Sequence, residues 1–181
     1  MAKFTYVEMT CELTPKEKGE SVLLGGVSFE PIKNIAPEIL YDCYIQSFRT
    51  GDARFFALQN EEERRRYYQE ELGFPEVLDN PASFAIISNE ELVGFTLVLP
   101  SSEKNYHISC MCLLPEYRNL GIGKAMLQRI KDIALKKGCR TLTLGTEPEM
   151  EAYQLYIHHG FKVIAEHTVN ICCLFHSVGL G

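Results

Sequence analysis

The sequence lacks the features expected of a nucleic-acid-binding, membrane-spanning or secreted protein. Its 181 residues include 18 Lys and Arg against 24 Asp and Glu, and the net charge of −6 disfavours the cationic surface that phosphate contacts require. The longest apolar-rich stretches, such as Phe95–Leu99, are far shorter than the roughly 20 residues of a transmembrane helix. A charge at Lys3 precedes any apolar block, so no secretory signal is predicted. We therefore predict a cytoplasmic protein with neither a nucleic acid nor a membrane as its partner.

The sequence also lacks the cysteine spacing of a metal site or a disulfide framework. Its seven cysteines are an odd number and include no Cys-x-x-Cys pair. On a strand, Cys110 and Cys112 would share one face, whereas the adjacent Cys172 and Cys173 would point to opposite faces. Zinc needs four convergent ligands, and no second spaced pair supplies them. We predict no metal, and reduced thiols that pack as small apolar side chains.

What the sequence does have is the composition of a globular domain. Hydrophobic residues make up 46% of the chain and charged residues 23%, which is close to the globular average. A chain of this length buries about two-thirds of its unfolded surface, so it needs no disulfide or metal to fold. No repeat, low-complexity segment or long linker interrupts it. Residues 1–181 are therefore predicted to form a single domain.

Two β-hairpins are predicted from apolar segments that flank short polar stretches. Segments 3–13 and 21–32 lie on either side of the polar stretch 14–20, which contains Pro and Gly and predicts an N-terminal hairpin or paired strands. Segments 83–88 and 92–99 are rich in β-branched and aromatic residues, and three polar residues join them. The second pair is therefore also predicted to be antiparallel.

Two helices are predicted between these hairpins. From Pro37, apolar residues recur at three- and four-residue spacing, which indicates an amphipathic helix ending at 50–52. A second helix follows Asn60, which is placed to cap its N-terminus reciprocally with Glu63. Its charged run, 61–66, is typical of a solvated helix face, with a binding patch as the alternative.

The rest of the chain alternates strands and helices. The predicted elements are a strand at 106–114, a helix at 123–137 capped by Gly138, a strand at 141–144, a helix at 149–159 stopped by Gly160, and strands at 161–165 and 171–175. The strand–helix–strand unit over 106–144 requires a right-handed crossover between parallel neighbours, whereas hairpins are antiparallel. The fold class is therefore α/β with a mixed sheet.

The turn at Leu114–Lys124 is the most informative stretch for chemistry. It joins a strand to a long helix, and Gly121 and Gly123 leave its backbone N–H groups open to a ligand. Unpaired N–H groups at a helix N-terminus bind anions such as a pyrophosphate. Arg118 and Lys124 add positive charge nearby. The turn is therefore predicted to bind phosphate through its backbone.

Other phosphate motifs fit this turn less well. A Walker A loop would need Gly at position 118 and Ser or Thr at 125, where the chain has Arg118 and Ala125. A dinucleotide fingerprint would need a small residue in place of Met126 and would open an early strand–helix unit. A Gly-x-Gly pair taken alone is also compatible with a simple tight connection.

Two sequence blocks in the right order resemble a known family. The pattern Arg118-x-x-Gly121-x-Gly123, after a strand and Pro-Glu-Tyr, resembles the acyl-CoA-binding motif of the GNAT superfamily of N-acetyltransferases. The block Ala-Tyr-Gln-Leu-Tyr-Ile-His-His-Gly-Phe at 152–161 is similar to that family's later signature. The resemblance covers about residues 92–165, and two spaced motifs are more specific than either alone.

The resemblance implies a fold and a co-substrate. It implies a central mixed β-sheet, splayed between two parallel strands and flanked by helices on both faces, with acetyl-CoA in the split. The backbone near 111–112 would also polarise the acyl carbonyl. The residues implied in coenzyme binding are Met111, Cys112 and Leu113 for the pantetheine arm, and Arg118, Asn119, Leu120, Gly121, Ile122, Gly123 and Lys124 around the pyrophosphate.

The resemblance implies that Tyr156 is the general acid that protonates the departing thiolate, with simple packing as the alternative. The resemblance does not identify the general base, because Leu144 occupies the position at which some relatives have a Glu. Glu149 occupies the position at which many relatives have an Asn that helps hold the coenzyme. His158 and His159 are better placed as partners of the helix C-terminus. The candidate bases are Glu147, Glu149 and His107.

The sequence thus predicts an acetyl-CoA-dependent N-acetyltransferase that transfers the acetyl group directly to a primary amine. The alternative is a non-catalytic, acyl-CoA-binding module of the same fold. The acceptor is a small-molecule or peptide amine, with the helices within 37–72 as its expected wall. The oligomeric state stays open, a homodimer included.

Overall fold

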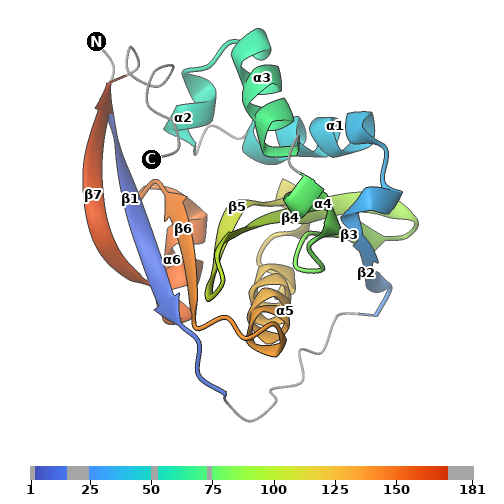
Figure 1. Ribbon diagram of the computed structural model, residues 1–181. Coiled ribbons are helices and arrows are strands. Elements are labelled where there is room, and N and C mark those ends of the chain that lie inside the picture. The colour runs from blue at the N-terminus through green and yellow to red at the C-terminus, as the bar shows by residue number, and fades with distance from the viewer. Residues whose placement is uncertain (1–2, 16–24, 50–52, 73–74, 171–181) are drawn as a thin grey trace.

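Seven strands form one twisted sheet in the computed structural model, which describes residues 3–15, 25–49, 53–72 and 75–170 (Figure 1). The strand order is β2-β3-β4-β5-β6-β1-β7. All neighbours are antiparallel except β5 and β6, which are parallel, so the predicted mixed sheet is confirmed. The strands are β1 (Lys3–Glu12), β2 (Val27–Pro31), β3 (Phe84–Ser88), β4 (Glu91–Ser102), β5 (Asn105–Leu113), β6 (Thr141–Thr146) and β7 (Lys162–Asn170).

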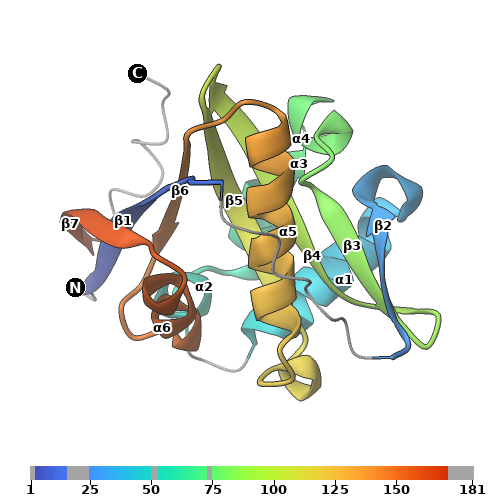
Figure 2. The ribbon, with the colours of Figure 1, turned by 90° about the horizontal axis from the view of Figure 1, so that it is seen from below.

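Helices cover both faces of the sheet, as the resemblance implies (Figures 1 and 2). One core lies between the sheet and α5 with α6, and a second core lies between β4, β5 and the helices α1 to α4. The helices are α1 (Pro37–Phe48), α2 (Arg54–Ala57), α3 (Glu61–Leu72), α4 (Pro75–Asp79), α5 (Ile122–Lys136) and α6 (Glu151–His158), with short 3₁₀ turns at Ile32–Asn34 and Pro115–Tyr117.

The predicted N-terminal hairpin is wrong, although both of its strands form. β1 lies between β6 and β7, pairing Met9 with Leu144 on one side and Glu8 with Ala165 on the other. β2 instead pairs with β3 at the far edge of the sheet. The alternation of apolar residues in β1 specifies a strand with one buried face, but it does not specify which strand will be the neighbour.

Local signals in the sequence were more reliable. The β3–β4 hairpin forms around Asn89 and Glu90, both at positive φ, as a two-residue turn requires. Asn60 Oδ1 accepts a hydrogen bond from Glu63 N–H at 2.9 Å, and Glu63 Oε2 accepts one from Asn60 N–H at 2.8 Å. These two bonds confirm the reciprocal cap. The short helices α2 and α4 were not predicted. The expected strand at 171–175 and the helix end at 50–52 lie outside the described residues.

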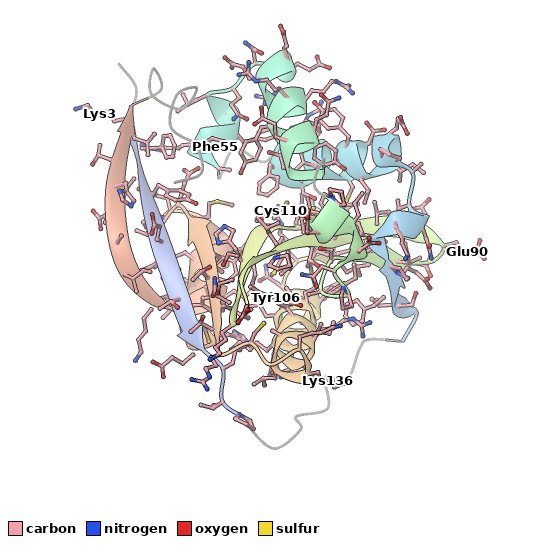
Figure 3. All side chains as sticks on the ribbon, viewed as in Figure 1. Lys3, Phe55, Glu90, Tyr106, Cys110 and Lys136 are labelled. Carbon is pink, nitrogen blue, oxygen red and sulfur yellow. The ribbon has the colours of Figure 1, made fainter. Side chains whose placement is uncertain are left out.

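A β-bulge determines where the sheet opens. Leu97 pairs with Cys110 but Val98 pairs with Ile108, so Ser109 is an extra residue in β5. The bulge turns Cys110 and Cys112 toward α1, on the face opposite Ile108, and Figure 3 shows Cys110 on that side. The parallel pairing of β5 with β6 ends at Ile108 and Leu144. The two strands therefore diverge from the bulge onward, and the predicted splay is confirmed.

Thr96 offers a test of the packing around this sheet. Its buried Oγ1 donates to the Ala82 carbonyl at 2.6 Å and accepts from Phe84 N–H at 3.2 Å. Thr96→Val keeps the shape but leaves both backbone groups without this partner, so the free energy of unfolding should fall by about 1–3 kcal/mol in urea titrations. Thr168→Val, on the exposed face of β7, is the control. An equal loss in both variants would contradict this account of Thr96.

Candidate active site

A cavity of about 370 Å³ opens where β5 and β6 diverge. The end of α1 and the start of α2 line it on one face of the sheet, while the N-terminal turns of α5 and α6 line it on the other. The cavity therefore passes through the split in the sheet. Its lining residues are Ser47, Phe48, Ala53, Met111, Cys112, Leu113, Arg118, Asn119, Gly121, Gly123, Lys124, Met150, Glu151, Ala152, Gln154 and Leu155.

One end of the cavity is the N-terminus of α5. Gly121 precedes the helix at φ 80, a left-handed conformation that favours glycine, and no side chain caps the helix there. The first hydrogen bond within the helix runs from Ala125 N–H to the Gly121 carbonyl, so earlier N–H groups of this turn have no partner inside the helix. Gly123 and Lys124 line the cavity at this turn. The arrangement suits an anion.

Arg118 connects its turn to two other walls of the cavity. Its Nη2 donates to the Ser47 carbonyl of α1, and its Nε donates to the Leu113 carbonyl of β5 at 3.3 Å. Beside it, Asn119 Nδ2 donates to Glu151 Oε1 of α6 at 3.1 Å. These bonds hold the turn against both flanking helices. The turn is thus a fixed part of the cavity wall.

The structure brings most of the predicted coenzyme residues together. All of them line the cavity except Leu120 and Ile122. Leu120 is 49% exposed, whereas Ile122 is buried in the core beneath α5. Sequence spacing placed the turn correctly but could not distinguish residues that face the cavity from residues that face the core or solvent.

Tyr156 lies in α6 beside the cavity, although it is not among the residues that line it. Its ring is buried and packs against Phe161 at a centroid distance of 5.7 Å. Burial raises the pKa of Tyr156, and the neighbouring thiols Cys110 and Cys112 raise it further. The phenol is therefore protonated at neutral pH, the state a proton donor needs.

The acidic candidates differ in their surroundings. Glu147 is 2% exposed, and its two oxygens accept from the N–H groups of Arg54 at 2.9 Å and Phe55 at 2.7 Å, which anchors α2. Burial raises the pKa of Glu147, and these two N–H groups oppose that shift. Glu149 is exposed. Neither side chain lines the cavity.

The histidines lie on different faces of the molecule. His107 of β5 is half-buried, and its Nδ1 lies 3.1 Å from Thr143 Oγ1. It lines a second cavity, of about 230 Å³, with residues of β1 and β6. His159 Nδ1 lies 2.7 Å from the Leu155 carbonyl, at the C-terminal end of α6, where a histidine partner was predicted, while His158 is exposed.

This arrangement agrees with the comparison to known families. Residues 36–161 match the family model of the acetyltransferase (GNAT) family. The chain belongs to this family. The motifs at the turn and at 152–161 therefore lie in a GNAT domain, and the family resemblance of the sequence is confirmed.

Several relatives carry acetyltransferase names. The chain is 32% identical over 93 residues to the uncharacterized N-acetyltransferase YhfO of Bacillus subtilis, a match covering 47% of this chain and 62% of YhfO, so it spans less than two-thirds of that relative. A GCN5-related N-acetyltransferase from Sphaerobacter thermophilus has a TM-score of 0.66 at 18% identity, covering 91% of this chain and 50% of that one. PaiA N-acetyltransferase from Thermoplasma acidophilum, in complex with coenzyme A, has a TM-score of 0.60 at 18% identity, covering 79% of this chain and 99% of that one. These structures share the GNAT fold.

Sequence reasoning missed the part that β1 contributes to this GNAT domain. Tyr6 and Glu8 line the second cavity because β1 lies next to β6. The alternation of these polar residues with Val7 and Met9 was visible in the sequence, but the hairpin prediction assigned the strand to the wrong neighbour. In the part of the chain that the structure describes, no three His, Cys, Asp or Glu side chains are placed to hold a metal ion. No helix in the same ranges is long and apolar enough to cross a membrane.

Burial of His107 has a consequence for stability. Burial lowers the pKa of His107, whereas the unfolded chain binds a proton near the ordinary value of about 6.5. The unfolded state therefore holds more protons just below pH 6.5, and the free energy of unfolding should fall as the pH decreases through this window. His107→Gln should show a shallower fall between pH 7 and 5 in denaturant titrations. Identical slopes in both proteins would contradict the lowered pKa.

Proposed function

We propose that this GNAT domain is an acetyl-CoA-dependent N-acetyltransferase that transfers the acetyl group directly to a primary amine. The observation that supports the proposal is the cavity at the split in the sheet, which has the N-terminus of α5 at one end and is lined by elements from both faces. The structurally similar PaiA protein was solved with coenzyme A. A direct transfer needs such a passage, because the amine must approach a thioester that enters from the other side.

The backbone of β5 supplies the site for the pantetheine arm. Beyond Ile108, β5 pairs with β4 on one edge but with no residue of β6 on the other. The backbone groups of 111–113 on that open edge can bond the amides of the arm like an added strand. Asn119 to Lys124 then surround the pyrophosphate with backbone N–H groups and the Lys124 ammonium. Bound acetyl-CoA supplies the activated acetyl group.

The reaction needs two proton transfers. A bond forms between the amine nitrogen and the acetyl carbon, and the carbon–sulfur bond breaks. N–H groups near 111–112 stabilise the charge on the carbonyl oxygen, and Tyr156 gives its proton to the departing thiolate. The amine proton goes to a base. His107 suits this role among the candidates because its lowered pKa leaves it neutral at neutral pH, with Glu147 and Glu149 as the alternatives.

A non-catalytic acyl-CoA-binding module is the second candidate. It is favoured by Leu144, the last residue of β6 that pairs with β5, because its side chain cannot act as a base, and by Glu147, whose oxygens already accept hydrogen bonds from N–H groups of α2. Release of coenzyme A, measured with a panel of amines, separates the two functions. An N-acetyltransferase should release coenzyme A with at least one amine and form the acetylated product. Tight binding of acetyl-CoA with no release for any amine would support the module.

A further inference from the structure

The second cavity lies on the sheet face opposite α5. Tyr6 and Glu8 of β1, Thr143 of β6 and His107 of β5 line it. They share one face because Glu8 pairs with Gly145 across β1 and β6, while His107 pairs with Thr143 across β5 and β6. At the end of the cavity near α2, the ring centroids of Phe4 and Phe55 lie 6.2 Å apart, and Figure 3 shows Phe55 between that helix and β1.

Tyr6 places this cavity beside the split in the sheet. A Cβ atom added at Gly145 would lie 1.5 Å from the Tyr6 hydroxyl oxygen, so the phenol crosses β6 directly over this glycine. Gly145 follows Leu144, the last residue of β6 that pairs with β5. The Tyr6 hydroxyl therefore lies where the two strands begin to separate, on the face opposite the N-terminus of α5.

The second cavity carries a negative charge in its described lining. Among the described residues that line it, Glu8 is the single carboxylate and none is Lys or Arg. Glu8 Oε1 lies 2.9 Å from His167 Nε2, and both side chains are about half exposed. A carboxylate accepts up to four hydrogen bonds, so Glu8 can accept one from a ligand ammonium while it keeps its contact with His167. Ile164, which is exposed, provides an apolar surface for a short carbon chain.

We propose that this cavity is the acceptor site and that it selects a small amine carrying a second cationic group. The proposal rests on the proposed acetyl transfer. The reacting amine must be neutral to attack the thioester, and a neighbouring carboxylate would stabilise its protonated form instead. Glu8 is therefore suited to the non-reacting ammonium. The reacting amine lies at the split beside Tyr6 and His107.

Calorimetric titration of three amines tests the site independently of turnover. The probes are 1,5-diaminopentane, pentylamine and 5-aminopentanoate, titrated with and without saturating coenzyme A. We expect the diamine to bind most tightly, and Glu8→Gln to weaken it about tenfold or more through loss of a charge-assisted bond. Glu12→Gln, an exposed change on the same strand, should leave binding within about twofold. Equal affinities for the diamine and pentylamine, or unchanged affinity in Glu8→Gln, would overturn the proposal.

Coenzyme A release with the same probes separates the two proposals. Selective acetylation of the diamine, lost in Glu8→Gln, supports both. Equal acetylation of the diamine and pentylamine in the wild type and in Glu8→Gln overturns the acceptor site and leaves the acetyltransferase standing. Selective, Glu8-dependent binding of the diamine, with no release for any amine, supports the binding site but overturns the proposed transfer.

Discussion

Tyr156→Phe is expected to lower kcat about a hundredfold while leaving the affinity for coenzyme A unchanged. The variant keeps the buried ring and its contact with Phe161, and it removes only the hydroxyl that would protonate the thiolate. General acid catalysis commonly contributes about 10²–10⁴-fold to a rate. The loss should appear in kcat and kcat/KM together, because the interaction is made mainly in the transition state.

Single-turnover kinetics with an amine that is demonstrably acetylated is the appropriate measurement, since product release can limit steady-state turnover. Tyr153→Phe is the matched control, because Tyr153 lies one turn earlier in α6 and packs against the same core. Full activity of Tyr156→Phe would reduce Tyr156 to a packing residue. A large loss of coenzyme A affinity would make it a ligand contact instead.

Gly123→Val is expected to weaken coenzyme A binding about tenfold to a hundredfold. Gly123 lines the cavity in the first turn of α5, and an added Cβ would lie 3.2 Å from Leu155 Cδ2. A β-branched side chain there covers the N–H groups that would bond the pyrophosphate, and charge-assisted hydrogen bonds contribute about 1.5–3 kcal/mol each. Gly121→Val should also weaken binding, but its φ of 80 adds backbone strain that complicates the comparison.

Calorimetry with coenzyme A measures this effect, and thermal unfolding checks that each variant is folded. Lys136→Val is the control, since it introduces the same β-branched residue at the exposed far end of α5. We expect it to bind like the wild type. If folded Gly123→Val also bound with unchanged affinity, this turn would not be the phosphate site.

The sequence was sufficient for the features that depend on neighbouring residues. The cap between Asn60 and Glu63, the turn at Asn89 and the glycine turn before α5 each depend on a few adjacent side chains and backbone angles. Most residues of the glycine turn lie in the cavity wall, but Leu120 faces solvent and Ile122 the core. Such local chemistry can be recognised without knowledge of the tertiary structure.

Long-range pairing could not be predicted in the same way. The position of β1 between β6 and β7 depends on contacts between the two ends of the chain, and nothing in its alternation specifies those partners. The bulge at Ser109 has no compositional signal, yet it reverses the faces of β5. The bonds from Glu147 to the N–H groups of Arg54 and Phe55 likewise depend on α2, a helix too short to predict from periodicity.

A crystal structure of the protein with coenzyme A tests the central claim most directly. The account predicts that the pyrophosphate oxygens lie within hydrogen-bond distance of N–H groups in the turn 119–124, with the pantetheine arm running along 111–113. The thiol should then reach the split beside Tyr156 and Gly145. A coenzyme bound elsewhere, or bound at this cavity with its pyrophosphate away from the start of α5, would contradict it.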